Sequence, residues 1–280
     1  MDEFPSICVQ GKLIDMRKPL VMGIINVNQD SFYAGSRASQ ISEILELARK
    51  HMDDGADILD VGASSTRPGA SISSAKDEIE VLIPVLKALR NEFPTAIISI
   101  DTYHSEVVLA LADFGMDIVN DISGGRFDKQ MFSTVAKLKL PYILMHIQGT
   151  PETMQVNPSY ENVVEDVLKD CAFRVKQLYS LGCKDIIVDP GFGFGKTLEQ
   201  NYSLLKHLTR FKQLGTPLLI GLSRKSMINK VLNCKADEAL NGTTALNTIA
   251  LLNGANILRV HDVKEAVEAL KIVQQYQLAL

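Results

Sequence analysis

Polar side chains that end short apolar runs are the residues of this sequence best suited to chemistry. Asp101, Asn120 and Asp189 each follow branched apolar residues, and Lys225 comes shortly after another such run. Carboxylates and an amide in one pocket suit a flat, NH-rich heterocycle, because they pair with its donors and acceptors. Two buried acids would repel each other without a cation, and Lys225 could supply that charge.

A second group of side chains has the chemistry of an anion site. Asn26, Arg259 and His261 also follow apolar runs. We expect Arg259 and His261 to have no acid partner in the site, although Asp262 directly follows His261. Arginine and histidine bind phosphate-like anions, and β/α barrels often hold phosphate near their last two strands. The alternative for Arg259 is a salt bridge with Asp262 or with an acid of the first group.

The segment Asp185–Lys196, DIIVDPGFGFGK, combines both kinds of signal. Its apolar run has the length of a buried parallel strand, and Pro190 with the glycines that follow predicts a tight loop close to another group. Asp189 at the end of the run is costly to bury unless it is paired. The alternative is that Asp189 only caps the turn or the next helix.

Alternating strand and helix patterns must position these side chains. The apolar runs predict eight strands, at Leu20–Val27, Ile58–Val61, Ala96–Ile100, Ile118–Val119, Tyr142–Met145, Ile186–Val188, Leu218–Leu222 and Ile257–Val260. Helical spacing of apolar residues predicts eight helices, at Ser39–Met52, Glu78–Glu92, Ser105–Asp113, Lys129–Lys137, Tyr160–Leu181, Glu199–Phe211, Ala236–Leu252 and Val263–Gln275.

This alternation favours an α/β fold of the (β/α)₈ TIM-barrel type. Strands that alternate with helices lie parallel and are joined by right-handed crossovers, and eight such units suit a barrel better than a doubly wound sheet. Ile7–Asp15 alternates around Gly11 and predicts a short hairpin that closes the bottom of the barrel. No change of composition marks a boundary, so residues 1–280 are expected to form a single domain. The polar strand ends would then meet at one rim.

Bulk composition excludes several classes of function. The net charge is −4 with no long run of one sign, which argues against nucleic acid as a partner. No apolar run approaches the roughly 18 residues of a membrane span, and the acidic N-terminus lacks the apolar core of a signal peptide. Four widely spaced cysteines predict free thiols in a reducing cytoplasm rather than a disulfide framework or a zinc site.

Nine segments together resemble the dihydropteroate synthase family. They occur in the family's order and spacing from about Met22 to the C-terminus: MGIINVNQDSF, STRPGA, SIDTY, VNDISGG, LMHIQGTPETMQ, VDPGFGFGKT, GLSRKSM, NGTTA and RVHDV. The resemblance implies a transferase of folate biosynthesis. Its substrates would be 6-hydroxymethyl-7,8-dihydropterin diphosphate and p-aminobenzoate, and its products 7,8-dihydropteroate and diphosphate.

The resemblance also implies roles for individual residues. Asp101, Lys225, Arg259 and His261 would be catalytic, and Asn26 would ligate Mg²⁺. The same four residues would bind substrate together with Thr66, Arg67, Pro68, Asn120, Met145, Asp189, Phe194, Gly221 and Ser226, and Phe32 would help to shape the aminobenzoate pocket. The family further implies a homodimer formed through the last helices and a target for sulfonamides.

Departures from the family's pattern fall in the first two loops and after His146. Asn28 and Gln29 replace the usual Thr-Pro, and Ala63-Ser64 replaces Gly-Glu. Ile147-Gln148 follows His146 where the family often has an arginine. These changes bear on loop order and on affinity for aminobenzoate or sulfonamides, whereas the residues that would hold the pterin are retained.

Three other functions fit part of the pattern. A pterin-dependent methyltransferase barrel would need the strand-end acids and amide but neither the anion site nor the segment Ser223–Ser226. A pterin- or sulfonamide-binding barrel without activity would not need Asn26, Arg259 and His261. A sugar-phosphate barrel would explain the anion site but not the pair of acids.

Overall fold

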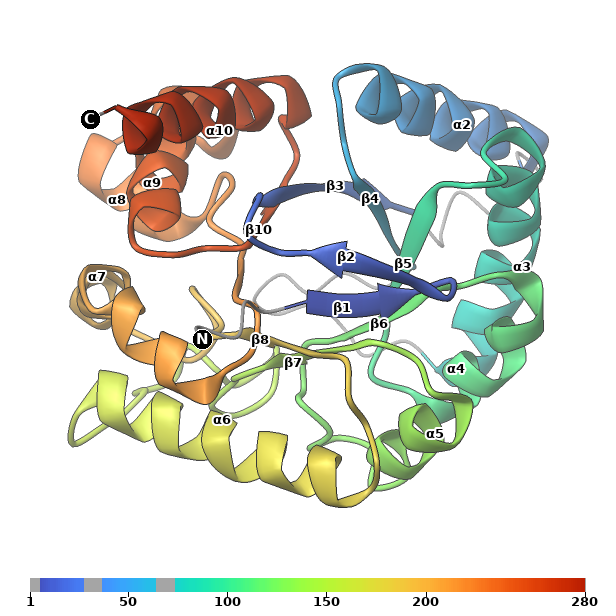
Figure 1. Cartoon of the computed structure of the whole chain (residues 1–280), viewed down its shortest axis with the longest axis horizontal. Coiled ribbons are helices and arrows are strands. Elements are labelled where there is room, and N and C mark those ends of the chain that lie inside the picture. The colour runs from blue at the N-terminus through green and yellow to red at the C-terminus, as the bar shows by residue number, and fades with distance from the viewer. Residues whose placement is uncertain (1–5, 28–36, 64–73, 280) are drawn as a thin grey trace.

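The strands form a closed parallel barrel in this computed structural model, which describes residues 6–27, 37–63 and 74–279 (Figure 1). The sheet has the order β8-β7-β6-β5-β4-β3-β10-β9, and a parallel bridge between Val188 and Leu218 joins its two edges. The strands of the barrel are β3 (Leu20–Asn26), β4 (Ile58–Gly62), β5 (Ile97–Asp101), β6 (Ile118–Asp121), β7 (Tyr142–Met145), β8 (Ile186–Asp189), β9 (Leu219–Ile220) and β10 (Ile257–Val260).

Helices surround the barrel on its outer side (Figure 1). They are α2 (Arg37–Asp53), α3 (Ala75–Glu92), α4 (Ser105–Leu111), α5 (Met131–Leu138), α6 (Val163–Ser180), α7 (Leu198–Lys206), α8 (Ser226–Leu232), α9 (Leu240–Leu252) and α10 (Val263–Leu278). Three short 3₁₀ turns accompany them, at Ala112–Phe114, Leu208–Leu214 and Ala236–Glu238. The predicted (β/α)₈ barrel is therefore confirmed.

Two details of the predicted helices were wrong. The segment Ser226–Leu232 forms α8, which the periodicity did not indicate because a helix of seven residues with two buried side chains is too short to show it. The helix predicted over Glu199–Phe211 ends at Lys206 and continues as a 3₁₀ turn. Both differences leave the strand ends where the sequence placed them.

The N-terminal hairpin covers one end of the barrel. Strands β1 (Ser6–Val9) and β2 (Lys12–Asp15) pair antiparallel through a turn in which Gln10 and Gly11 have φ values of 51° and 73°. Positive φ at both turn residues is the geometry of a tight two-residue hairpin. Buried side chains of the hairpin pack against residues of the barrel interior, which include Ile118, Ile143 and Ile187. This confirms the predicted closure of the bottom.

The barrel interior places the polar side chains at the opposite end. One inner layer contains Ile118, Ile143, Ile187, Leu219 and Ile257. Alternate side chains of a strand point to the same face, so the residues two positions further along also point inward. Those residues are Asn120, Met145, Asp189, Gly221 and Arg259. Period-two alternation therefore gathers them in the next layer, at the carboxyl ends of the strands.

No helix within residues 6–27, 37–63 and 74–279 is long and apolar enough to cross a membrane.

Candidate active site

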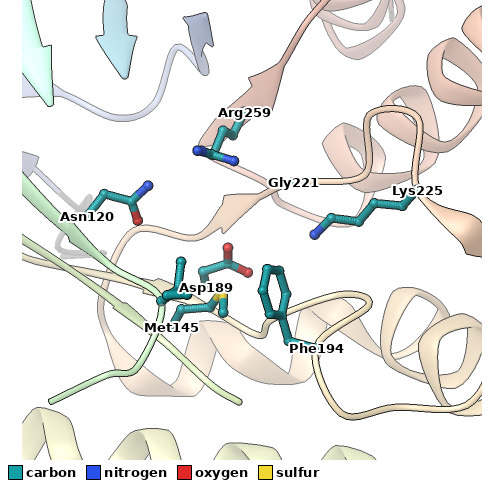
Figure 2. Close-up of a pocket in the computed structure, with 8 residues that line it drawn as sticks. Asn120, Met145, Asp189, Phe194, Gly221, Lys225 and Arg259 are labelled. Atoms are coloured by element: carbon teal, nitrogen blue, oxygen red, sulfur yellow. The ribbon is translucent and has the colours of Figure 1, made fainter. Parts of the chain in front are cut away.

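A pocket at the carboxyl ends of the strands collects most of the predicted binding residues (Figure 2). Figure 2 shows Asn120, Asp189, Lys225 and Arg259 directed toward a common space. The pocket is lined by Asn120, Ile122, Met145, Asp189, Phe194, Gly221, Lys225 and Arg259. All but Ile122 were identified from the sequence, and Ile122 follows directly after the end of β6.

Asp189 ends β8 and lies buried at this pocket. Its Oδ1 accepts a hydrogen bond from the backbone N–H of Gly191 at 2.7 Å, so it also supports the following turn, as the alternative interpretation proposed. Burial raises the pKa of Asp189, and the nearby Lys225 ammonium opposes that shift. One carboxylate thus both fixes the loop and offers an acceptor to the pocket.

Lys225 supplies a cation near Asp189, whereas Asp101, the other acid of the expected pair, is paired with Arg259. It is the residue before α8, and its Nζ donates to the carbonyl of Phe192 and lies 4.9 Å from the centre of the Phe194 ring. Burial lowers the pKa of Lys225 to about 8, while Asp189 favours the charged form. The ammonium is therefore held by a carbonyl and lies over an aromatic face, and the charge of Asp189 acts on it.

Arg259 is paired with acids, so the expectation of an arginine without an acid partner was wrong. Its Nε donates to Asp60 Oδ2 at 2.6 Å, and its Nη2 donates to Asp101 Oδ2 at 2.7 Å. The alternative of an ion pair with a rim acid is the one that the structure shows. Asp262 is bound by Arg224 instead, whose Nε lies 3.0 Å from Asp262 Oδ2.

Asp101 lies close to several other acids. Burial raises its pKa to about 7, helped by the carboxylates of Asp60, Glu78 and Asp121 and opposed by Arg259. A carboxyl group with this pKa changes its charge near neutral pH. Because the Arg259 guanidinium lowers this pKa, the charge of Asp101 depends on where the guanidinium lies.

Asp60 is a site residue that the sequence analysis missed. It is completely buried in β4, and its Oδ2 accepts hydrogen bonds from both Arg259 and Asn120, the latter at 3.1 Å. The signal that could have found it is its spacing. Asp60 comes two residues after Ile58, which belongs to the inner apolar layer, and so has the inward phase of the other site residues.

Lys196 and His146 form a second buried group that the sequence analysis did not identify. Lys196 is 2% exposed, and its Nζ donates to Gly191 O at 2.8 Å, Phe194 O at 2.9 Å and His146 Nδ1 at 3.1 Å. Burial lowers the pKa of Lys196 to about 7 and that of His146 to about 2. A neutral imidazole can accept through Nδ1, so Lys196 links the loops that follow β7 and β8.

The remaining predicted residues lie at the rim. His261 Nδ1 is 3.0 Å from Ser223 Oγ, and the exposed Ser226 begins α8. Asn26 is exposed at the end of β3 and pairs in register with Gly62, where an added Cβ would lie 3.1 Å from the Cβ of Asp101. The candidates Phe32, Thr66, Arg67 and Pro68 lie outside the described residues.

A metal site made by the protein alone is not found in the described part of the chain, where no three His, Cys, Asp or Glu residues are grouped for one. The amide oxygen of Asn26 is a ligand type that suits Mg²⁺, which usually takes one or two protein oxygens and completes its shell with water and substrate phosphates. The donor set therefore fits a magnesium ion that enters with a phosphorylated substrate.

Comparison with known proteins gives one consistent family. The profile of the family described as pterin binding enzyme matches residues 22–261. The dihydropteroate synthase of Haemophilus influenzae is 43% identical over 265 residues, which cover 94% of this chain and 96% of the relative.

Solved structures agree with the sequence relatives. The Yersinia pestis dihydropteroate synthase, in complex with a sulfonamide drug, superposes with a TM-score of 0.91 at 37% identity and covers 98% of this chain and 100% of its own. The Xanthomonas albilineans enzyme with 4-aminobenzoic acid gives a TM-score of 0.90 at 34% identity, with 99% and 100% covered. Together with the acids, amide and cations of the pocket, these matches show that the chain belongs to the pterin-binding enzyme family and, within it, to the dihydropteroate synthases.

Proposed function

We propose that this protein condenses 6-hydroxymethyl-7,8-dihydropterin diphosphate with p-aminobenzoate, forming 7,8-dihydropteroate and diphosphate for folate biosynthesis. The observation that carries the proposal is the single pocket lined by Asn120, Asp189, Lys225 and Arg259. Its two halves match the two parts of the substrate, a flat polar ring and a polyanion.

The pterin ring would lie against Asn120, Asp189 and Lys225. Asp189 keeps Oδ2 for the ring while Oδ1 holds Gly191, since no hydrogen bond to Oδ2 is found among the described residues. The carboxylate accepts from ring N–H groups, and the Asn120 amide and the Lys225 ammonium donate to ring nitrogen and oxygen atoms. Met145 and Ile122 provide apolar contacts to the faces of the ring.

The diphosphate would be received by Arg259 and His261. The Arg259 guanidinium binds Asp60 and Asp101. Binding of the polyanion would therefore require Arg259 to exchange Asp101 for a phosphate oxygen. The positive charge that develops on the pterin methylene carbon would then replace the guanidinium as the charge that keeps Asp101 ionised, and the carboxylate would offset it.

Magnesium would be held by Asn26 and the diphosphate oxygens. When bound, Mg²⁺ would neutralise charge that develops on the leaving diphosphate. Arg259 and His261 would orient the same group. The arylamine needs no general base to attack, because it is neutral and nucleophilic at pH 7.

We further propose that cleavage of the C–O bond runs ahead of amine attack. The reason is the arrangement of the site, which brings the cations Lys225 and Arg259 to the pocket where a leaving anion would lie. A trapping or isotope experiment in the pre-steady state tests the order. Diphosphate release that occurs only in concert with amine attack would contradict it.

The assay for the overall reaction measures diphosphate release in the presence of both substrates. Release should depend on both the pterin diphosphate and p-aminobenzoate, and omission of Mg²⁺ should abolish it. Arg259→Ala should lower kcat by about 100-fold or more, as loss of a transition-state cation does, and Arg17→Ala, an exposed arginine of the hairpin, is the matched control. A wild type that neither binds the pterin diphosphate nor releases diphosphate would refute the proposed reaction.

A homodimer through the last helices is proposed on the apolar surface that they expose. Ile249 and Leu252 of α9 are 41% and 46% exposed, and Ile272 and Tyr276 of α10 are 69% and 70% exposed. Helices α9 and α10 lie together on one side of the barrel (Figure 1). Exposed large apolar side chains on two neighbouring helices are typical of an interface.

A further inference from the structure

Asp60 connects the two halves of the site through one oxygen atom. Its Oδ2 accepts from Arg259 Nε at 2.6 Å and from Asn120 Nδ2 at 3.1 Å, which brings together β4, β6 and β10. The side chain is completely buried, and its Oδ1 has no hydrogen-bond partner among the residues that the structure describes. A buried carboxylate is costly, so its retention here calls for a reason beyond packing.

The ion pairs of Arg259 with two different acids suggest that reason. Nε faces Asp60, whereas Nη2 faces Asp101, which is the acid nearer the rim. A guanidinium paired with Asp101 alone would have to break its whole ion pair before it could bind another anion. With Nε held by Asp60, only the Nη2 contact must be exchanged, and the direction of the guanidinium is kept during the exchange.

We propose that Asp60 is a positioning residue that holds Arg259 by Nε and Asn120 by its amide, so that Arg259 can transfer Nη2 from Asp101 to the diphosphate of the substrate. This inference rests on the proposed function, because it assigns Asp60 a part in binding that substrate. Asp60 itself touches neither the ring nor the diphosphate. It fixes the relative position of a ring-binding amide and an anion-binding guanidinium.

Two substitutions separate the charge of Asp60 from its hydrogen bonds. Asp60→Asn can keep both contacts, because its amide oxygen can take the place of Oδ2 while its NH₂ takes the place of the unpartnered Oδ1, but it removes the charge. Asp60→Leu removes both. Ser99→Ala is the matched control. Ser99 is the register partner of Asp60 on β5 and is completely buried, and its Oγ has no hydrogen-bond partner in the described part of the chain.

The first measurement is steady-state kinetics together with binding of inorganic diphosphate by calorimetry. Asp60→Asn should raise KM for the pterin diphosphate and weaken diphosphate binding by about 3- to 10-fold, and Asp60→Leu by roughly 10- to 100-fold, as the loss of one or two charge-assisted hydrogen bonds predicts. KM for p-aminobenzoate should stay within about twofold. Ser99→Ala should change none of these values by more than about twofold.

The second measurement is the pH profile of kcat/KM, which a purely structural role would leave unmoved. Asp101 faces Arg259, Asp60, Glu78 and Asp121, and the Asp60 charge favours its protonated form. Removal of that charge in Asp60→Asn lowers the pKa of Asp101. The acid limb of the profile should therefore move to lower pH.

The outcomes separate this inference from the proposed function. A wild type that releases no diphosphate would refute the function. An active wild type whose Asp60→Asn variant binds diphosphate within twofold of normal and keeps its pH profile would overturn the role of Asp60. A parallel rise in both KM values, with a loss of thermal stability, would also overturn it, because it would mark a general packing defect. If Asp60→Leu does not fold, the isosteric Asp60→Asn decides the question.

Discussion

Replacement of Lys196 by methionine should remove a pH dependence from the free energy of unfolding. Lys196 is buried with Nζ bonded to three acceptors, and burial lowers its pKa from the ordinary 10.5 to about 7. Methionine has a similar length and no charge. The variant therefore keeps the volume and loses only the titrating group and its hydrogen bonds.

The sign follows from the protons that each state binds. Below pH 7 the lysine is protonated in both the folded and the unfolded chain, so it adds no slope. Between pH 7 and about 10 the folded protein has released the proton and the unfolded chain has kept it. Stability therefore rises with pH across this window, by up to about 1.4 kcal/mol per pH unit.

The magnitude can be measured as a difference between the two proteins. The free energy of unfolding of wild type minus that of Lys196→Met should grow by roughly 3 kcal/mol between pH 7 and 9.5. Subtraction removes the contribution of Lys225, which titrates in both proteins. Urea unfolding followed by circular dichroism suits the measurement, because the chain contains no tryptophan for fluorescence.

The control is Lys184→Met, which removes an exposed lysine that lies just before β8. Its difference from wild type should stay flat with pH. Equal slopes for wild type and Lys196→Met would show that Lys196 keeps its ordinary pKa in the folded protein. The account of a buried, partly neutralised link between the two loops would then fail.

Two further predictions concern the backbone of the site and the proposed interface. Gly191→Ala should destabilise the protein by several kcal/mol in thermal or urea unfolding, because Gly191 has a φ of 73° and an added Cβ would lie 1.8 Å from the carbonyl oxygen of His146. Gly182→Ala, with a φ of 91° and no atom within 4 Å of the added Cβ, should cost only about 1–2 kcal/mol, and equal losses would contradict the close-approach argument. Ile272→Glu should convert a dimer to monomers in sedimentation experiments while Lys271→Glu, on an exposed neighbour, should not; a wild type that is already monomeric would exclude the interface.

The pattern of the sequence determined the fold and most of the pocket. Apolar runs that alternate with segments of helical spacing predict parallel strands. The two-residue period of a strand then fixes which of its side chains point inward. Asn120, Asp189 and Arg259 could therefore be assigned to one rim before any coordinates were known. Asp60 has the same inward phase, but it was not chosen as a binding residue from the sequence.

Pairings across the barrel were decided by the tertiary structure alone. Arg259 reaches Asp60 and Asp101 over separations of 199 and 158 residues, and no local pattern says which of several inward acids it will meet. The same holds for Lys196. Its Nζ contacts carbonyls of its own loop and also reaches His146, which lies 50 residues earlier. Sequence periodicity fixes the layer in which a side chain lies, whereas closure of the barrel brings distant strands together and so fixes its partners and its charge.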